Sequence, residues 1–376
     1  MATVAEDLKK IRTAKKVDIG NIPQWRLMVR RFKQSKLSVI ALIVLIIMYI
    51  MVVLSDFISP YAHYELDTSA SFAAPSKLQW TAQGPAIFGQ KQTLDEVRFQ
   101  WIYEEDPSIV YPIKFFVPGY QYWLLGVIPS TTHLFGIDVP GTVTPKPKML
   151  LWGADKEGRD LFSRIMKGSQ ISMSVGFVAV FVSVVLGTLI GTASGYFGGA
   201  IDNAIQRVVE LIQSFPDLPL FLALAAALPV DVPVVTRFFL VTLVIGLIGW
   251  TGLSRAVRGK VLAYRNADYT NAAKAAGASH WYIITKHMVP NTMSHVIVVA
   301  MLAIPAAIGT ETALSFLGLG VLPPAVSWGL LLRDSQSIQA VLTYPWLLIP
   351  VAALVFAVMA FNLLGDGVRD AVDPYG

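Results

Sequence analysis

Long uncharged apolar runs alternate with polar segments along most of the chain. The first run, Leu37–Leu54, carries no charge and approaches the roughly 20 residues that an α-helix needs to cross the hydrocarbon core of a bilayer. A long polar arm precedes this run, so it predicts a retained membrane helix rather than a cleaved signal peptide. Five further runs predict five more membrane helices, at Ile171–Gly195, Ile212–Leu228, Phe238–Leu253, Met293–Leu317 and Leu342–Leu364.

The third of these runs is the weakest of the six. Its clean apolar stretch is short, and Pro216 and Pro219 lie near its start. Proline is tolerated in the first turn of a helix but disrupts a helix interior. We therefore expect the helix to begin close to these prolines.

Composition agrees with the hydropathy pattern. Of the 376 residues, 54% are hydrophobic and 15% are charged, against about 45–50% and about 25% in soluble proteins. These values exclude an ordinary cytosolic enzyme, a disordered tail and a fibrous protein, and the absence of cysteine excludes disulfides and Cys-ligated metals. We predict an all-α polytopic membrane protein with six transmembrane helices in a lipid bilayer.

Basic residues cluster beside the apolar runs and predict the orientation of the chain. Residues 1–36 carry ten Lys and Arg against three acids, and residues 255–290 carry six against the single acid Asp268. Loops rich in Lys and Arg remain in the cytoplasm. Six helices then place both termini in the cytoplasm, and the net charge of +5 reflects membrane orientation rather than a nucleic-acid partner.

These features divide the chain into four parts. A cytoplasmic arm (1–36) leads into the first transmembrane helix (37–57), and an extracytoplasmic insertion (58–165) precedes a five-helix core (166–376) with a cytoplasmic loop at 260–290. The insertion is rich in aromatic residues, Pro and Gly, so we expect it to fold, although the pattern does not predict how. It is either a packed cap over the helices or a docking surface for an external partner.

Motifs for catalysis and for metal binding are absent from the sequence. Gly259-Lys260 lacks the rest of a phosphate-binding P-loop, so the chain has no nucleotide site of its own. The five histidines are scattered and none lies in a metal-ligand spacing. We therefore expect no catalytic residue, no metal and no cofactor in this chain.

Two features inside the predicted helices have open interpretations. Small residues recur every four positions in the second helix, at Ser183, Gly187, Gly191 and Gly195, and such a stripe lets another helix approach closely. The stripe is either intrachain packing or a seam with a second membrane subunit. Glu311 is an ionisable residue in the fifth helix, where it is either functional or a hydrogen-bonded structural group.

The cytoplasmic loop predicts two short helices. Asn266 or Asp268 can cap the first helix and Gly277 can end it, whereas Ser279 can cap the second and Pro290 can stop it. The first helix is rich in alanine and presents a small, smooth face. Such a face fits a groove in another protein, and resting on the membrane surface is the alternative.

The same loop resembles the EAA loop of bacterial ABC-importer permeases. The resemblance rests on Tyr269–Gly277 (YTNAAKAAG) followed by Ile284 and Val289-Pro290-Asn291. Four more motifs support it, at residues 153–160 (GADKEGRD), 195–199 (GYFGG), 314–320 (LSFLGLG) and 367–370 (GVRD) with Asp373-Pro374. Together they resemble the C-type permease subunit of the dipeptide, oligopeptide and nickel importer family, over about residues 20–60 and 150–376.

The resemblance implies a type I ABC importer permease fold in a bacterial cytoplasmic (inner) membrane. It implies a second permease subunit, two cytoplasmic ABC ATPases that bind ATP and Mg, and an extracytoplasmic solute-binding protein. In this reading the permease pair alternates between inward- and outward-facing states without covalent chemistry. The residues that it assigns to ATPase coupling are Asp268, Tyr269, Asn271, Ala272, Ala273, Lys274, Ala276 and Gly277.

One residue departs from the family pattern, since the loop usually begins with Glu and this chain has Asn271. Asp268 lies three residues earlier, on nearly the same helix face. We hypothesise that Asp268 supplies the missing carboxylate.

The sequence leaves more than one substrate and more than one class of membrane protein open. Peptides are the favoured substrate, with oligosaccharides or a metal chelate such as nickel as alternatives. A stand-alone channel or secondary transporter would need an ion path, yet little ionisable material besides Glu311 lies in the helices. A membrane enzyme would need a convergent site that the sequence lacks.

Overall fold

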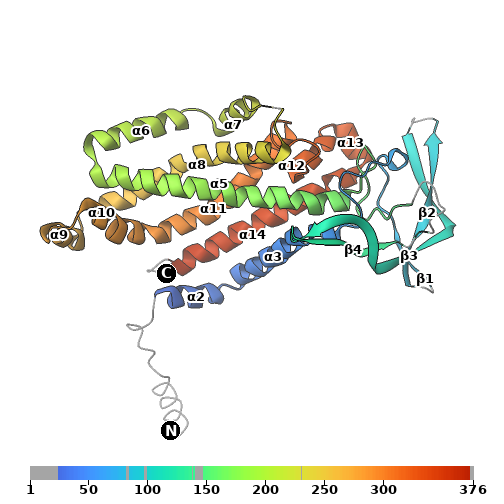
Figure 1. Ribbon diagram of the computed structural model, residues 1–376, viewed down its shortest axis with the longest axis horizontal. Helices are drawn as coiled ribbons and strands as arrows, with labels where there is room; N and C mark the ends of the chain where they lie inside the picture. Colours follow the sequence, from blue (N-terminus) through green and yellow to red (C-terminus); the bar gives the residue numbers. More distant parts are fainter. Residues whose placement is uncertain are drawn as a thin grey trace, which may run out of the picture.

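A computed structural model describes residues 24–81, 84–96, 100–137, 139, 147–229 and 231–372. The longer helices form a bundle, with the strands at one end and α9 and α10 at the other (Figure 1). The helices are α2 (Gln24–Gln34), α3 (Lys36–Val53), α4 (Ser55–Ile58), α5 (Leu161–Phe197), α6 (Gly199–Gln213), α7 (Asp217–Ala226), α8 (Val234–Tyr264), α9 (Asp268–Ala275), α10 (His280–Ile283), α11 (Val289–Phe316), α12 (Trp328–Leu331), α13 (Ile338–Thr343) and α14 (Ile349–Val372). Short 3₁₀ segments lie at Thr68–Ala70, Leu332–Ser335 and Pro345–Leu348, and a π-helical segment, η3, lies at Ile284–Met288.

Five of the six expected membrane helices are continuous helices in the described part of the chain, and the expected third falls on a bent helix pair. Among the described residues, α3, α5, α8, the continuous helix His280–Phe316 and the segment Pro345–Val372 are long and apolar enough to cross a membrane. α6 and α7 meet at an angle of 85°, and together they are long and apolar enough for either a broken crossing or a re-entrant loop. Pro216 is the N-cap of α7, as its place near the start of the third run predicted. The bent pair returns the chain to the strand end before α8 (Figure 1).

The second membrane helix begins ten residues before its apolar run, at Leu161. Asp160 caps it, because its carboxylate accepts hydrogen bonds from the backbone N–H and the hydroxyl of Ser163 at 2.8 and 2.6 Å. Asp155, fully buried before the cap, binds the guanidinium groups of both Arg159 and Arg164. The GADKEGRD motif is thus a buried charge network that fixes the start of α5.

The insertion folds as a four-stranded antiparallel sheet in the order β1-β2-β3-β4. Its strands are β1 (Leu78–Thr81), β2 (Gly84–Asp95), β3 (Gln100–Leu124) and β4 (Ile128–Ile137). The all-α prediction therefore holds for the membrane part, while the part without a predicted fold is a β-sheet.

Contacts of aromatic side chains fasten the insertion to the helix ends that lie beside the sheet. Phe72 stacks on Tyr344 with ring centroids 4.2 Å apart. Trp346 donates from Nε1 to the Ala154 carbonyl at 3.0 Å, and Phe135 contacts Phe162. These contacts support the packed-cap interpretation of the insertion.

The centre of the bundle is the seam between α5 and α8. Gly187, Gly191 and Gly195 face α8 so closely that a Cβ on them would meet Leu253 at 2.9 Å, the Ser254 carbonyl, and Val261 at 2.8 Å, respectively. Missing side chains therefore let the two helices touch along several turns. Within this chain the glycines of the stripe pack against α8.

Candidate functional site

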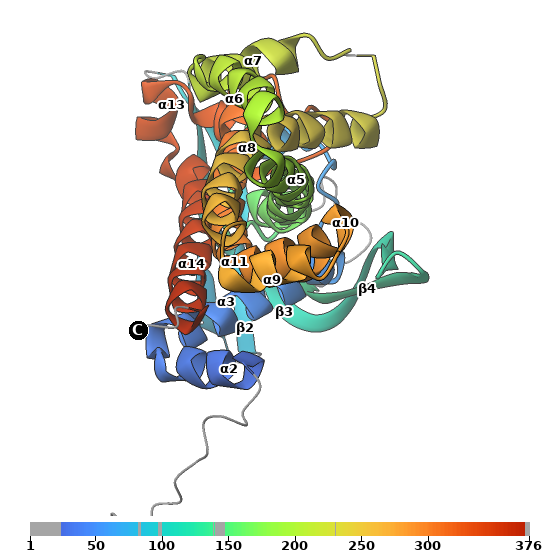
Figure 2. The same ribbon diagram turned by 90° about the vertical axis from the view of Figure 1, so that its left-hand side faces the viewer.

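The loop at residues 260–290 forms a compact helical unit at the end of the bundle opposite the sheet, and Figure 2 shows α9 and α10 together there. In α9, the side chains of Asp268, Tyr269, Asn271, Ala272 and Lys274 are exposed. Ala276 and Gly277, which follow α9, are exposed too, and Ala273 is half-buried. The residues that the resemblance assigns to coupling thus lie together on one small helix and its C-terminal turn.

The helix ends differ in part from the prediction. Ser279 caps α10 through the Tyr282 N–H, and Gly277 takes a φ of +80° just after α9, so both predictions are confirmed. Neither Asn266 nor Asp268 caps α9: Ala267 occupies the N-cap position, and Asp268 is the first helical residue.

The predicted stop at Pro290 is wrong. Pro290 is the second residue of α11, and the helix runs without a break from His280 through η3 to Phe316. Pro290 has no backbone N–H to donate, but the π-helical turn η3 lies directly before it, and such turns are where a helix absorbs an irregularity without ending. The second loop helix is therefore the beginning of the fifth membrane helix.

A buried apolar cluster anchors the loop to three membrane helices. It contains Ile283 and Met288 from the loop, Tyr196 from α5, Val257 and Val261 with Leu253 from α8, and Val296 from α11. Ala273 and Ala278 pack against it. Tyr196 also hydrogen-bonds His280 at 2.9 Å between Oη and Nδ1. Movement of the loop is consequently coupled to α5, α8 and α11 through direct packing.

Hydrogen bonds fix the shape of the loop. Thr270 is fully buried and donates to the Tyr264 carbonyl at 2.9 Å, and the Lys274 ammonium donates to the Arg265 carbonyl at 3.0 Å. Tyr269 accepts a hydrogen bond from the Asn291 amide at 3.4 Å, and partial burial raises the pKa of its phenol. The loop is a preformed element whose outer face stays open to solvent.

An ion pair with its hydrogen bonds also holds this end of the molecule together, and the sequence did not predict it. Arg258 on α8 forms a bidentate ion pair with Asp202 on α6, with both N···O distances 2.6 Å. Ser194 on α5 donates to the same carboxylate, and Arg265 donates to the Gly195 carbonyl at 3.3 Å. The partners lie 56 or more positions apart in most of these pairs, so no local pattern marks them.

Asp268 and Asn271 lie one turn apart at the start of α9. Both are exposed, and the Asn271 amide donates to the Asn266 carbonyl at 3.0 Å. The arrangement brings the Asp268 carboxylate to the helix face that carries Asn271. The proposal that Asp268 substitutes for the family Glu remains a prediction.

Glu311 lies far from the loop, near the strand end of α11. It is fully buried and accepts hydrogen bonds from Ser172 at 3.2 Å and from Ser315 at 2.6 Å. Ser172 in turn accepts from the Trp328 backbone N–H at 3.0 Å, and Ser315 accepts from that of Val321 at 2.9 Å. Glu311 therefore joins α5 and α11 to the segment before α12, and the geometry favours its structural interpretation.

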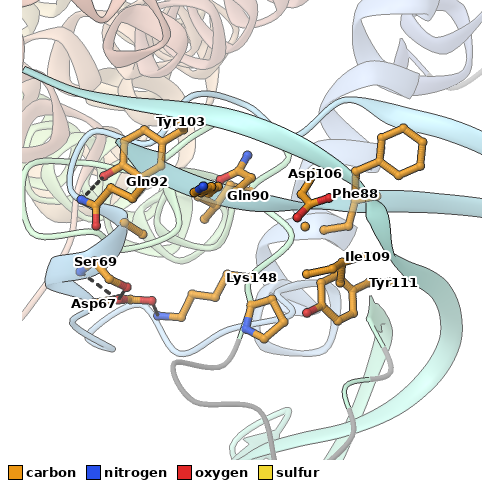
Figure 3. Close-up of a pocket in the computed structure, with 16 residues that line it drawn as sticks. Asp67, Ser69, Phe88, Gln90, Gln92, Tyr103, Asp106, Ile109, Tyr111 and Lys148 are labelled. Carbon is orange, nitrogen blue, oxygen red and sulfur yellow. Dashed lines mark hydrogen bonds and ion pairs between the residues drawn. The ribbon is translucent and has the colours of Figure 1, made fainter. Parts of the chain in front are cut away.

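The insertion also contains a cleft of about 460 Å³, shown in Figure 3. The ammonium of Lys148 lies between the insertion and the segment before α5, bound to Glu65 at 3.2 Å and Asp67 at 3.6 Å. Tyr103 accepts a hydrogen bond from the Gln92 amide on another wall of the cleft. Among the described residues, no group of three or more His, Cys, Asp or Glu is placed to hold a metal ion.

A bundle of membrane-crossing helices with an anchored, solvent-exposed helical element at one end is the architecture of a membrane transport component. The family described as "Binding-protein-dependent transport system inner membrane component" matches residues 183–375. This chain belongs to that family. Residues 23–75 match a second family, "N-terminal TM domain of oligopeptide transport permease C".

Curated relatives agree with this assignment. The oligopeptide transport system permease protein OppC of Bacillus subtilis is 32% identical over 247 residues, which are 65% of this chain and 76% of the relative. OppC of Salmonella typhimurium is 42% identical over 59% of this chain and 72% of its own length. The dipeptide transport system permease protein DppC of B. subtilis is 34% identical over 59% and 68%.

Among solved structures, the inward-facing MetNI methionine ABC transporter is 20% identical with a TM-score of 0.45, covering 56% of this chain and 96% of that chain. An amino acid ABC transporter is 15% identical with a TM-score of 0.42, covering 55% and 92%.

Proposed function

We propose that this chain is the membrane permease subunit of an ATP-driven importer of di- and oligopeptides in a bacterial inner membrane. It forms the translocation path with a second permease subunit, and α9 docks into a groove on one of two cytoplasmic ATPases. The contacts in that groove differ between the two states of the transporter. An extracytoplasmic binding protein delivers the peptide at the strand end. The observation that carries this proposal is the exposed α9, which packs through one apolar cluster against α5, α8 and α11.

Coupling requires that the ATPase contacts differ between two states of the permease. The half-buried Ala273 joins the loop to the cluster, whereas Ala272, Ala276 and Lys274 are exposed and available to a partner. When two ATPases close on ATP, they draw the loop along, and the packed helices follow it as a unit. The chain itself contributes no reacting group to this cycle.

The peptide assignment is supported by the relatives, which are named as oligopeptide or dipeptide permeases. A cavity of about 300 Å³ lies between the helices and is large enough to form a small part of the translocation path. Alanine, glycine and aliphatic residues make up most of its lining, and Ser183, Asp217 and Thr310 are its polar members. Such a lining favours little side-chain selectivity in the permease itself. The binding protein then makes most of the choice.

The test reconstitutes the chain with its co-purifying partners in proteoliposomes and measures ATP hydrolysis with di- and oligopeptides, oligosaccharides or Ni²⁺. We expect stimulation by peptides. If only sugars or nickel stimulate ATP hydrolysis, the importer assignment stands and the proposed peptide substrate is wrong. A chain that purifies alone and moves solute without ATPases overturns the importer assignment.

Docking of α9 is tested by Ala272→Glu in the same complex. A charge on the smooth face should abolish stimulated hydrolysis and release the ATPases on affinity purification. Ala200→Glu is the matched control, because Ala200 is an exposed alanine on α6 at the same end of the molecule. Equal ATPase recovery from both variants contradicts the docking role.

A further inference from the structure

The sheet of the insertion divides into a charged half and an uncharged half. The charged half comprises β2 and the beginning of β3, where Lys91 pairs in register with Glu104 and Gln90 with Glu105. From residue 115 to residue 137, which covers the end of β3, the turn and β4, the sequence has no Lys, Arg, Asp or Glu. Strands of a water-exposed sheet usually carry polar residues on the solvent face, so the uncharged half needs another explanation.

The tip of this uncharged β3–β4 hairpin is apolar and open. The side chains of Trp123, Leu125, Val127 and Ile128 are between 53% and 70% exposed. Gathered on one hairpin end, they form a patch of the kind that marks an interaction site. Among the residues that the structure describes, none buries this patch.

The turn of the hairpin has an unusual backbone conformation. Leu125 and Gly126 both have left-handed backbones, with φ of 54° and 73°. Leu124 pairs with Ile128, so the loop holds the three residues Leu125–Val127, and a bulky side chain such as that of Leu is uncommon at a left-handed backbone position. Backbone geometry therefore does not explain the leucine at this position, and its exposed side chain adds to the apolar surface of the tip.

The hairpin is fastened to the outer end of the first membrane helix. His133 on β4 is fully buried and makes ring-nitrogen contacts with the carbonyl oxygens of Asp56 at 2.9 Å and Tyr120 at 3.0 Å. The Tyr120 hydroxyl donates to the Asp56 carboxylate at 3.3 Å, and Phe116 contacts Phe57. Asp56 lies in α4, directly after α3.

The lipid-facing surface of α3 leads up to the hairpin. Ile46, Ile50 and Val53 on α3 are half exposed in a helix of high hydropathy. Figure 2 shows the hairpin standing out from the side of the bundle, and in Figure 1 its turn lies level with the outer end of α3. The exposed apolar tip thus lies at the level where the apolar surface of α3 ends.

We propose that the β3–β4 hairpin is a membrane-surface anchor whose tip, Trp123 to Ile128, enters the outer interface of the bilayer beside α3. Trp123 suits the headgroup level, where indole rings are enriched, and the aliphatic residues of the tip suit the boundary with the acyl chains. A water-soluble partner would leave the tip bare whenever it dissociates, whereas the bilayer covers it at all times. The charged half of the sheet then projects into water.

The test uses the absence of cysteine from the chain. Val127→Cys and, in the charged half, Glu104→Cys are each labelled with a nitroxide. The assembled transporter is reconstituted in phosphatidylglycerol and phosphatidylcholine vesicles. Collision of the label with O₂, which concentrates in lipid, is compared with collision with a water-soluble Ni²⁺ chelate. We expect an O₂-to-Ni²⁺ collision ratio several-fold higher at position 127 than at position 104.

Two results overturn the anchor. If position 127 meets the Ni²⁺ chelate as freely as position 104, the tip lies in water. If position 127 is shielded from both reagents, protein covers the tip, and the occupant is a partner subunit rather than lipid. Both labelled sites are exposed, so retained ATP hydrolysis reports folded protein, and the collision measurement needs no transport substrate.

Discussion

Replacing Gly277 with valine tests whether the turn after α9 must keep its geometry for coupling. The glycine has a φ of +80°, and no atom lies within 4 Å of a Cβ built there. The penalty therefore comes from the backbone alone, about 1–2 kcal/mol for a non-glycine residue in a left-handed conformation. Since each 1.4 kcal/mol is about a tenfold change in an equilibrium, the fraction of loops in the docking geometry should fall about five- to thirtyfold.

The assay measures peptide uptake per ATP hydrolysed in proteoliposomes that contain the assembled transporter. We expect Gly277→Val to lower this ratio about tenfold, because the turn leaves its native geometry far more often, while Gly277→Asn retains most of it because Asn tolerates a left-handed backbone. Gly259→Val is the matched control: Gly259 lies in α8, has no positive φ and has nothing within 4 Å of its Cβ position. Uptake per ATP that stays at the parental level in Gly277→Val would refute the reasoning.

Three further predictions concern the seam, the cap of α5 and the loop. Gly191→Ala should lower the stability of the detergent-solubilised protein by about 1–3 kcal/mol through overpacking, because the new Cβ meets the Ser254 carbonyl. Gly252→Ala is the control and should leave stability unchanged, because open space surrounds its Cβ position. Equal melting temperatures of the two variants would contradict close packing between α5 and α8. Burial raises the pKa of Asp160 to about 6 from 3.8, so the native state holds this proton more tightly than the unfolded chain and loses stability as the pH rises from about 4 to about 6. Asp160→Asn should flatten that part of the melting profile, and an unchanged profile argues against the shift. Asp268→Ala should lower stimulated ATP hydrolysis and a second change, Asn271→Glu, should restore it; an Asp268→Ala variant with parental activity would show that no carboxylate is needed.

Hydropathy predicted the membrane part because a crossing helix must satisfy its backbone internally and be apolar for its length. The same reasoning missed the first ten residues of α5, since that segment is held by Asp160 and the Asp155 network rather than by an apolar run. It also expected one helix at Ile212–Leu228, whereas that run falls across the end of α6 and the whole of α7, which meet at an angle of 85°. Apolar periodicity carries no signal for such a bend.

The sheet could not be predicted, because proline within β3 argues against a strand. Pro112 and Pro118 both lie in β3, the second of them where the register with β4 shifts. Prolines are confined to edges and irregular points of sheets, so the pattern did not predict a strand there. In the loop unit, local capping rules located Ser279 and Gly277 correctly, but the Asp202–Arg258 ion pair depends on contacts distant in sequence.

The unbroken helix from His280 to Phe316 makes the exposed loop one end of a lever. Its 37 residues span about 55 Å at about 1.5 Å per residue, and a tilt of about 5° displaces the far end of such a rod by about 5 Å. Pro305 removes one backbone hydrogen bond within the rod, so any bending concentrates there. A small tilt imposed at one end of the helix thereby displaces the other end by several ångströms. The size of this displacement depends on which point along α11 stays fixed during the tilt.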